Sequence, residues 1–457
     1  MSRREGRIEI DNSQLYRKLA RIAVPISIQG VVSATLNLID NLMVGFLGEA
    51  DLAAVGIASQ IYFIHYLILY GFTSGTATFT AQFYGAKDYK NIRKVVGFSI
   101  VVALCIAIIF FTAGFFFTDK ILGIYSNDPR IIEMARPYVK IGTANFFFLA
   151  VSVPLEMAFK ATQQTRVPLI VSTVVFSTNT CLNYIFIFGK FGAPAMGVAG
   201  AALATAIARF LEVLISLIFA HRKSNCFHGS YSEFFGWKKE MVLRIVKNSM
   251  PTTLNELLWS VGQSMYVAAF SRIGTTAYAA YQAAASINSI FSFAAFSVGD
   301  AALILVGEKL GEGEGEQTYL LGKKLLKIGT VLGIIVGILL VLAAKPLVGF
   351  FSLTALGKTY AFRILVIYGL CMGLNLYNGI NITGTLRGGG DTRFAMVAEC
   401  SCVWIVAVPL AFLASQVLHV PIFIAVLMIK AEEVVKCVIL TKRFISKKWV
   451  NNVITGL

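Results

Sequence analysis

The chain repeats itself after half its length. A stretch that begins at Val24 reads VPISIQGVVSATLNLIDNLMVGFLGEADLAAVGIASQI, and one that begins at Met250 reads MPTTLNELLWSVGQSMYVAAFSRIGTTAYAAYQAAASI. With a constant offset of 226 residues, Pro25 falls on Pro251 and no gap is needed. Both copies are very apolar. Two equivalent membrane bundles that face each other across a cleft are what alternating access requires, so the repeat indicates a transporter.

The later parts of the two halves match as well, with small gaps. KATQQTR at 160–166 matches RGGGDTR at 387–393, and IARFLEVLI at 207–215 matches MIKAEEVVK at 428–436. The repeat therefore covers most of each half. It predicts two pseudosymmetric lobes of equal helix number.

The composition excludes a soluble protein, because 57% of the 457 residues are hydrophobic and only 14% are charged. Long apolar runs recur along the whole chain, each able to cross about 30 Å of hydrocarbon as a helix. Continuous runs exclude a β-barrel, whose strands alternate. We therefore predict an all-α integral membrane protein of about twelve transmembrane helices, over 17–45, 52–83, 92–117, 132–159, 167–189, 193–220, 247–272, 276–308, 322–344, 361–386, 394–416 and 420–441.

The net charge of +16 is a topology signal and gives no reason to expect nucleic-acid binding. Both tails and the even-numbered loops together hold 28 Lys and Arg, whereas the odd-numbered loops hold 9. The basic side of a membrane protein faces the cytoplasm, so both termini should be cytoplasmic. We expect a cytoplasmic tail at 1–16, an N-lobe at 17–221, a cytoplasmic linker at 222–246, a C-lobe at 247–442 and a cytoplasmic tail at 443–457.

Asp40 is the strongest candidate for an ion-binding residue. It lies deep in the segment 17–45 with no basic residue nearby in the sequence, and its repeat mate is Tyr266. Desolvation favours proton binding by an isolated carboxylate, and neutral oxygen ligands beside it could instead complete a Na⁺ site. Asn179 and Asn183 share one helix face at i, i+4, and Thr205 adds a hydroxyl.

Other acids in the apolar segments are weaker candidates. Glu256 lies three residues before Trp259, and an acid beside an aromatic ring could attract an organic cation. Glu212 follows Arg209 at i, i+3, and Glu433 follows Lys430 at the same spacing. We expect both of these to be ion pairs within one helix.

These residues resemble the multidrug and toxic compound extrusion (MATE) family over nearly the whole chain. The resemblance is carried by Pro25 followed by Asp40 and VGFLG, by LAAVGIA, by AQFYGA with LVGEKLG, and by NTCLNYIFIFG, GVAGAALATAIA and TLRGGGDTR. It implies twelve helices in two lobes and the export of cationic drugs against entry of H⁺ or Na⁺. It also assigns Asp40, Asn179 and Thr205 to the family's ion site, with Asn183 where many relatives have an aspartate.

The second half departs further from the family pattern. The acid that some relatives carry after Pro251 would fall near Trp259, about one turn from Glu256. The stretch LNLYNGINITGTLR offers only asparagines, among them Asn378, where those relatives have another acid. Glu256, Trp259 and Asn378 are therefore candidates for substrate binding or a second acid, and the coupling ion is expected in the N-lobe.

Three other classes of function have less support. A lipid-linked oligosaccharide flippase has a similar helix number and repeat, but it needs a cationic cavity for pyrophosphate. The internal repeat gives no reason to expect a channel or a receptor. An enzyme is not expected, because no catalytic constellation, ATP motif or metal-ligand cluster is visible, and no cofactor is predicted beyond the coupling ion.

We expect a secondary antiporter for bulky organic cations, in contact with membrane lipids and sufficient as a monomer because two halves are fused. The bacterial inner membrane is the expected location, since no cleavable signal peptide is visible in MSRREGRIEIDNSQL.

Overall fold

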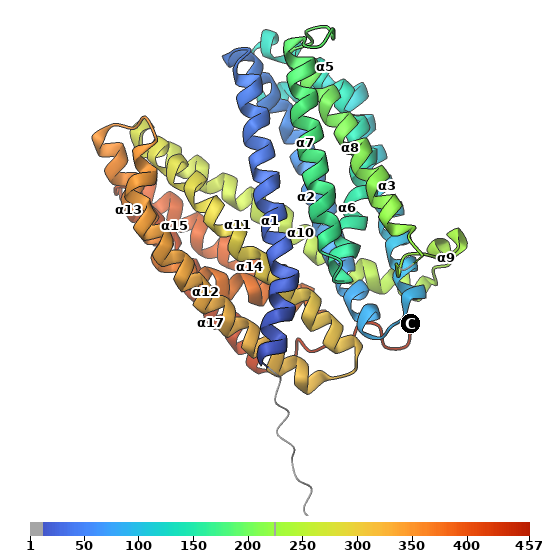
Figure 1. The fold of residues 1–457 in the computed structure, drawn as a ribbon. Helices are drawn as coiled ribbons and strands as arrows, with labels where there is room; N and C mark the ends of the chain where they lie inside the picture. The colour runs from blue at the N-terminus through green and yellow to red at the C-terminus, as the bar shows by residue number, and fades with distance from the viewer. Residues whose placement is uncertain (1–11, 224) are drawn as a thin grey trace, which may run out of the picture. The chain divides into compact units, whose positions relative to one another are not determined.

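The computed structural model describes residues 12–223 and 225–457, and this part of the chain is helical (Figure 1). The helices of the first half are α1 (Asn12–Gly45), α2 (Glu49–Gly85), α3 (Tyr89–Phe116), α4 (Thr118–Tyr125), α5 (Pro129–Gly142), α6 (Ala144–Ala161), α7 (Arg166–Phe188), α8 (Val198–Ala220) and the short α9 (Tyr231–Phe235). The prediction of an all-α membrane protein is confirmed.

The second half contains α10 (Lys239–Ser271), α11 (Thr275–Gly311), α12 (Gly315–Gly349), α13 (Ala355–Gly379), α14 (Thr392–Ser401), α15 (Val408–Phe412), α16 (Ile422–Ile429) and α17 (Ala431–Ile445), with π-helical segments η1 (Ile380–Leu386), η2 (Cys402–Ala407) and η3 (Leu413–Val417) between them. Helix α13 continues directly into η1. In the same way, α14, η2, α15 and η3 form one continuous helix. π-Helical turns are often found at functional sites.

Each of the twelve predicted segments corresponds to helical structure. Ten helices in the described residues are long and apolar enough to cross a membrane. The segment predicted at 247–272 is α10, which is not among these ten because polar side chains within it, such as Asn255, Glu256 and Gln263, lower its hydropathy. The segment predicted at 420–441 is divided into α16 and α17 at Lys430, and the one at 132–159 is divided into α5 and α6 at Thr143.

The chain divides into two compact units. Unit 1 comprises residues 1–27, 81–87 and 254–457, and unit 2 comprises residues 28–80 and 88–253. The halves of the repeat are therefore recognisable, but the first turns of α1 and the end of α2 belong with the second half. The membrane boundaries expected from the charge pattern remain predictions.

Close packing between glycines explains why the end of α2 belongs to unit 1. Gly85 lies against the backbone of Glu308, and Gly311 lies against the backbone of Gln82. Gly85 and Gly311 are repeat mates, so the same small residue serves both helices at their crossing. Small residues let membrane helices approach closely, and this contact replaces the hydrophobic effect that drives packing in water.

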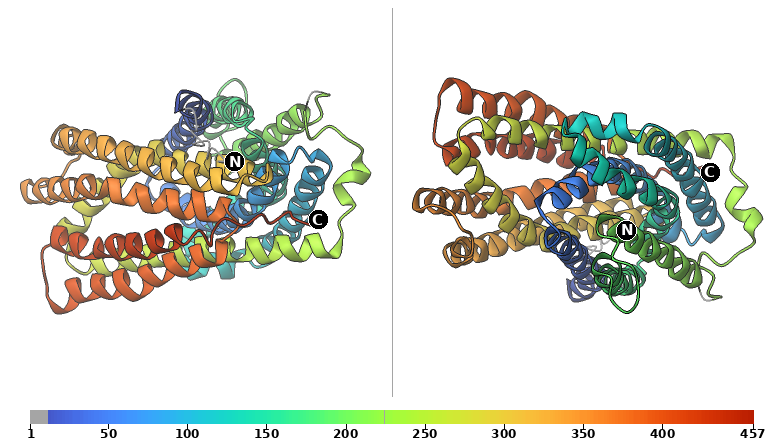
Figure 2. Two further views of the ribbon diagram at one scale, coloured as in Figure 1. Left: turned by 90° about the horizontal axis from the view of Figure 1, so that it is seen from below. Right: turned by 90° about the horizontal axis from the view of Figure 1, so that it is seen from above.

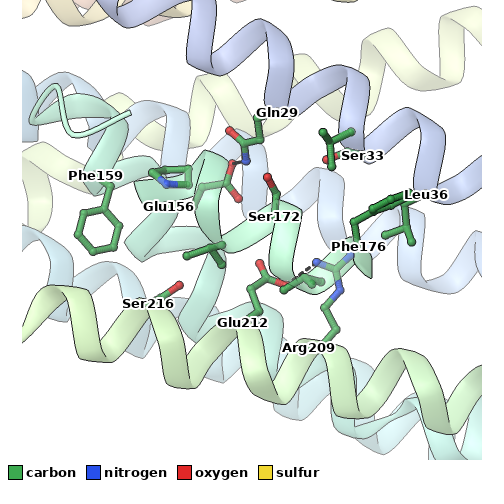
Figure 3. A pocket seen from close by; sticks show the side chains of 14 residues that line it. Gln29, Ser33, Leu36, Glu156, Phe159, Ser172, Phe176, Arg209, Glu212 and Ser216 are labelled. Atoms are coloured by element: carbon green, nitrogen blue, oxygen red, sulfur yellow. Dashed lines mark hydrogen bonds and ion pairs between the residues drawn. The ribbon is translucent and has the colours of Figure 1, made fainter. Parts of the chain in front are cut away.

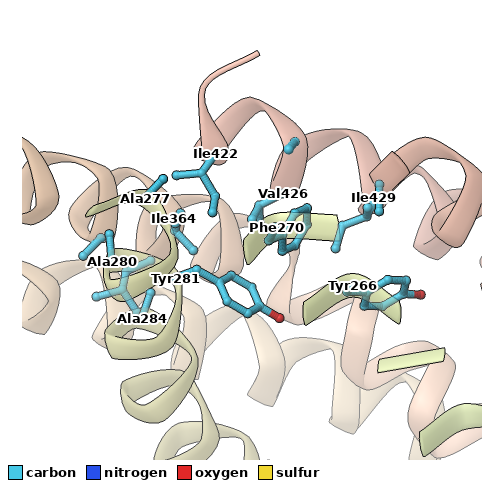
Figure 4. Packing of buried hydrophobic residues seen from close by; sticks show 14 of the residues in the cluster. Tyr266, Phe270, Ala277, Ala280, Tyr281, Ala284, Ile364, Ile422, Val426 and Ile429 are labelled. Carbon is cyan, nitrogen blue, oxygen red and sulfur yellow. The ribbon is translucent and has the colours of Figure 1, made fainter. Parts of the chain in front are cut away.

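Within unit 1, α12 and α13 run side by side (Figure 2). Gly333 and Gly337 of α12 lie against Gly373 and Gly369 of α13, so the two helices meet along a row of small residues. The core of this unit collects buried side chains from α10, α11, α13 and α16, among them Phe270, Tyr281 and Val426 (Figure 4). Unit 2 has its own core between α2, α3, α5 and α6.

Two segments predicted as polar loop or tail pack onto the helices. In the linker, Glu233 of α9 pairs with Arg93 of α3 at 2.7 Å, and the backbone of Phe234 lies against Gly97. Near the end of the chain, Trp449 is fully buried and stacks on Phe444.

Candidate ion-binding site

Asp40 lies in the C-terminal half of α1, within unit 2, and its carboxylate is met by an amide from α7. Asn183 Nδ2 donates to Asp40 Oδ1 over 2.6 Å. A neutral donor this close to a carboxylate forms a charge-assisted hydrogen bond, which holds the acid in one place without neutralising it. The carboxylate therefore keeps its ability to bind a cation.

The other predicted partners continue this contact as a hydrogen-bonded chain. Asn183 Nδ2 also donates to Asn179 Oδ1 over 2.9 Å, and Asn179 Nδ2 reaches Thr205 Oγ1 of α8 over 3.3 Å. The Thr205 hydroxyl donates onward to the carbonyl of Ala201. The four predicted residues therefore form one polar cluster contributed by α1, α7 and α8.

The helix period explains why α7 delivers two amides to the same point. Asn179 and Asn183 are four residues apart, so both lie on the face of α7 that is turned into unit 2, where they are 2% and 1% exposed. The same face carries Val171, Val175 and Ile187, which are buried as well. The asparagines are therefore the polar positions of an otherwise apolar stripe.

One acceptor in the cluster, Asn183 Oδ1, is buried and has no hydrogen-bond partner among the residues that the structure describes. An unsatisfied buried acceptor is costly, and it is satisfied by a donor or a cation. An amide oxygen beside a carboxylate and a hydroxyl is a donor set that suits a hard monovalent cation or a proton. The residues present thus fit the ion that the sequence predicts at Asp40.

A cavity of about 100 Å³ lies beside this cluster, between α1, α6, α7 and α8 (Figure 3). Glu156 lines it and is bound by Gln29 at 2.8 Å and by Lys160 at 2.7 Å. Arg209 and Glu212 point toward each other across the pocket wall and pair at 2.6 Å, as the sequence predicts. The pocket is therefore charged, but each charge in it has a partner of opposite sign.

The candidates in the second half are not brought together. Glu256 pairs with Arg387 at 2.8 Å, and the Arg387 side chain is only 2% exposed. Asn378 instead donates to Glu433 Oε2 over 2.7 Å. Trp259 is 38% exposed. Glu256 and Asn378 thus belong to two separate networks, and the roles proposed for all three remain predictions.

The predicted ion pair between Lys430 and Glu433 is wrong. The structure pairs Glu433 with Lys436 at 3.7 Å, whereas the Lys430 ammonium lies 5.2 Å from the ring centre of Tyr368. Lys430 lies at the junction of α16 and α17, and its side chain lies against Tyr368 instead of Glu433. Sequence reasoning missed Lys436, although the stretch KAEEVVK places it four residues after Glu432.

Comparison with known proteins gives one consistent family. A sequence profile of the MatE family matches residues 25–185 and again 251–413, so the two matches coincide with the two halves of the repeat. The probable multidrug resistance protein NorM of Thermotoga maritima is 25% identical over 95% of this chain and 93% of its own length. The multidrug resistance protein MdtK of Yersinia pseudotuberculosis is 24% identical over 87% of each chain.

Solved structures show the same fold. An outward-facing multidrug resistance MATE family transporter of the MOP superfamily superimposes with a TM-score of 0.85 over 96% of this chain and 99% of its own, at 18% identity. A MOP superfamily transporter from Pyrococcus furiosus, for which a binding pocket of reverse polarity suggests a different function, superimposes with a TM-score of 0.82 over the same shares of the two chains, also at 18% identity. Because the two scores are so close, the fold alone does not decide the substrate.

The double profile match, the full-length relatives and the helical repeat agree. This chain belongs to the MATE family of multidrug efflux transporters, which are multi-pass membrane proteins.

Proposed function

We propose that this protein is a secondary antiporter that exports bulky organic cations in exchange for an inward-moving cation, H⁺ or Na⁺, bound at Asp40. The observation that carries the proposal is the polar cluster of Asp40, Asn183, Asn179 and Thr205. It places one carboxylate beside two neutral amides and a hydroxyl inside an apolar bundle, and Asn183 Oδ1 is an acceptor without a partner among the described residues. Ionisable residues inside membrane segments mark ion pathways.

Coupling follows if the ion and the substrate compete for one state of the N-lobe. A ligand shifts a conformational equilibrium only as far as its affinities for the two states differ. The ion would bind Asp40 from outside, distort α1 and release the substrate. Loss of the ion to the cytoplasm would reset the protein.

The course of α1 supports a role for this helix in the change. Pro25 lies inside α1 and removes one backbone hydrogen bond, which makes this point a natural site for bending. The division between the two compact units falls just after it, between Ser27 and Ile28. The segment with Asp40 thus belongs to one unit and the segment before the proline to the other.

The pocket beside Asp40 supports a cationic substrate. Its lining includes the rings of Phe159 and Phe176, whose faces attract an organic cation, and the carboxylates of Glu156 and Glu212, which would exchange Lys160 and Arg209 for it. The flippase alternative is not favoured. It needs free basic side chains, whereas Arg209 in this pocket is held by Glu212. We place the protein in the bacterial inner membrane as a monomer.

Ethidium efflux from proteoliposomes tests the proposal. The purified protein is reconstituted, and a pH gradient and a Na⁺ gradient are imposed separately. We expect one gradient to drive efflux and Asp40→Asn to abolish it with normal expression. The matched control is Asp119→Asn, since the Asp119 side chain is 59% exposed and pairs with Arg136 at the surface. Full efflux by Asp40→Asn would remove Asp40 from the mechanism, and no efflux under either gradient would turn attention to lipid-linked substrates.

A further inference from the structure

Unit 1 contains a second buried cluster of charged residues, at the start of α17. Glu432, Glu433 and Lys436 lie there within two turns of helix and are 5%, 4% and 5% exposed. Charged side chains this deeply buried must be paired or neutralised, because taking them out of water costs several kcal/mol each. Each of these three charges therefore needs a partner or a proton.

Glu433 is fully compensated. Its carboxylate pairs with Lys436 at 3.7 Å and accepts hydrogen bonds from two amides of α13, Asn375 at 3.0 Å and Asn378 at 2.7 Å. A cation and two amides together satisfy one carboxylate. Glu433 can therefore stay ionised in this position, and Lys436 is engaged by it.

Glu432 has far less support. It accepts one hydrogen bond, from the hydroxyl of Tyr266 on α10, at the long distance of 3.3 Å. Among the described residues, no cation lies within ion-pair distance of this carboxylate. A buried carboxylate with a single weak neutral donor is uncompensated, and such a group binds a proton instead of staying charged.

The charges around Glu432 already balance without it. The groups that face it from its own helix and from the elements packed against α17 are Glu433, Lys436, Lys430, Tyr266 of α10, Asn375 and Asn378 of α13, Glu399 of α14 and Cys402 of η2. Two carboxylates and two ammonium groups thus surround Glu432, so its own ionisation would add a negative charge in excess. Nearby, Arg387 is already paired with Glu256.

The amide of Asn378 borders the same cluster. Asn378 is 1% exposed, its Nδ2 is bound to Glu433, and among the described residues its Oδ1 has no hydrogen-bond partner. The cluster thus includes a buried acceptor without a donor. An ionised carboxylate only accepts hydrogen bonds, whereas a protonated one supplies an O–H donor.

The internal repeat relates this cluster to the site in the N-lobe. Tyr266 is the repeat mate of Asp40, and Glu433 is the repeat mate of Glu212. In the N-lobe the acid comes from α1, and its neutral partners come from the later helices. In the C-lobe the helix equivalent to α1 supplies the neutral hydroxyl of Tyr266, and the acid comes from α17. The two lobes thus carry these buried acids on helices that are not equivalent in the repeat.

We propose that Glu432 is a second proton-binding group of this transporter, located in the C-lobe and separate from Asp40. Tyr266 is its hydrogen-bond donor, and the Glu433–Lys436 pair keeps the neighbouring charges fixed. The ligand is a proton, because Glu433 is already held by Lys436 and two amides, and the Glu432 carboxylate with the Tyr266 hydroxyl offers too few oxygen atoms to enclose a metal ion.

Infrared difference spectroscopy of the reconstituted protein tests this proposal without depending on transport. A protonated carboxyl group has a C=O stretching band that a carboxylate lacks, and this band shifts in D₂O. A pH titration of the wild-type protein should show two such bands from buried groups. Asp40→Asn should remove one of them, Glu432→Gln the other, and the double variant both.

Two further variants keep the test decisive. Tyr266→Phe removes only the donor, so the band of Glu432 should remain while its midpoint moves in pH. Glu316→Gln is the control, because the Glu316 side chain is 70% exposed, and it should change neither band. If Glu432→Gln does not fold, the Tyr266→Phe shift still reports on the site. The proposal is overturned if Asp40→Asn abolishes all buried carboxyl signal, or if both bands persist in Glu432→Gln with an unchanged midpoint in Tyr266→Phe.

Discussion

The pair formed by Glu256 and Arg387 gives a direct test of whether Glu256 is a structural or an ion-binding acid. The two side chains are 14% and 2% exposed and meet at 2.8 Å. Arg387→Met removes the cation that pairs with the Glu256 carboxylate, and Glu256→Gln removes the anion that pairs with the guanidinium. Breaking a buried ion pair from one side costs about 3–5 kcal/mol, whereas replacing both partners is close to neutral.

The assay is a double-mutant cycle measured as the free energy of unfolding in detergent micelles. We expect each single variant to lose about 3–5 kcal/mol and the double variant Glu256→Gln/Arg387→Met to recover most of it, which gives a coupling energy of about 3 kcal/mol or more. The matched control is the surface pair of Arg136 and Asp119, with side chains 42% and 59% exposed, for which we expect a coupling of about 0–1 kcal/mol. Additive effects at Glu256 and Arg387 would refute the structural role and leave Glu256 available to bind an ion or a substrate.

Three other predictions concern separate parts of the molecule. Asn183→Leu removes the 2.6 Å donor of Asp40, and because such a bond to a charged group is worth about 1.5–3 kcal/mol, the cation concentration for half-maximal ethidium efflux should change by roughly 10- to 100-fold. Gly311→Val forces a side chain against the carbonyl of Gln82 and should cost about 1–3 kcal/mol in thermal unfolding, whereas Gly349→Ala, with open space around it, should stay within about 0.5 kcal/mol. Trp449→Ala should cost about 3–5 kcal/mol, because the ring is fully buried, and an unchanged melting temperature would contradict this packing.

The helices could be predicted because the length of each apolar run can be counted in the sequence. Every predicted segment has a helical counterpart, since lipid leaves the backbone no other way to satisfy its hydrogen bonds. The two breaks inside the segments differ in this respect. Gly142 and Thr143 are a helix-end and a helix-start signal that the prediction of one segment did not use, whereas nothing in the sequence near Lys430 separates a continuous helix from an interrupted one.

The contact among Asp40, Asn179, Asn183 and Thr205 could be predicted, because these residues follow local rules, and their role in ion binding stays a prediction. Asn179 and Asn183 share a face by the helix period, and Asp40 stands out as an acid without a nearby base. The unpaired Oδ1 of Asn183 could not be predicted, since the orientation of an amide depends on its neighbours in space. The same limit applies to the pairing of Glu433 with Lys436, which depends on how the side chains around α17 pack.

The difference between the two lobes bears on how one fold serves different transporters. The repeat keeps the backbone of the halves equivalent, yet the position occupied by Asp40 in one half is occupied by Tyr266 in the other. The C-lobe then acquires its buried acid from α17, where Glu432 meets the Tyr266 hydroxyl. An acid on α17 in place of one on α10 leaves the fold unchanged, because the side chains of Tyr266 and Glu432 meet inside the same lobe. Chains of this fold can therefore differ in which ions they bind, and the side chains of each lobe have to be considered separately.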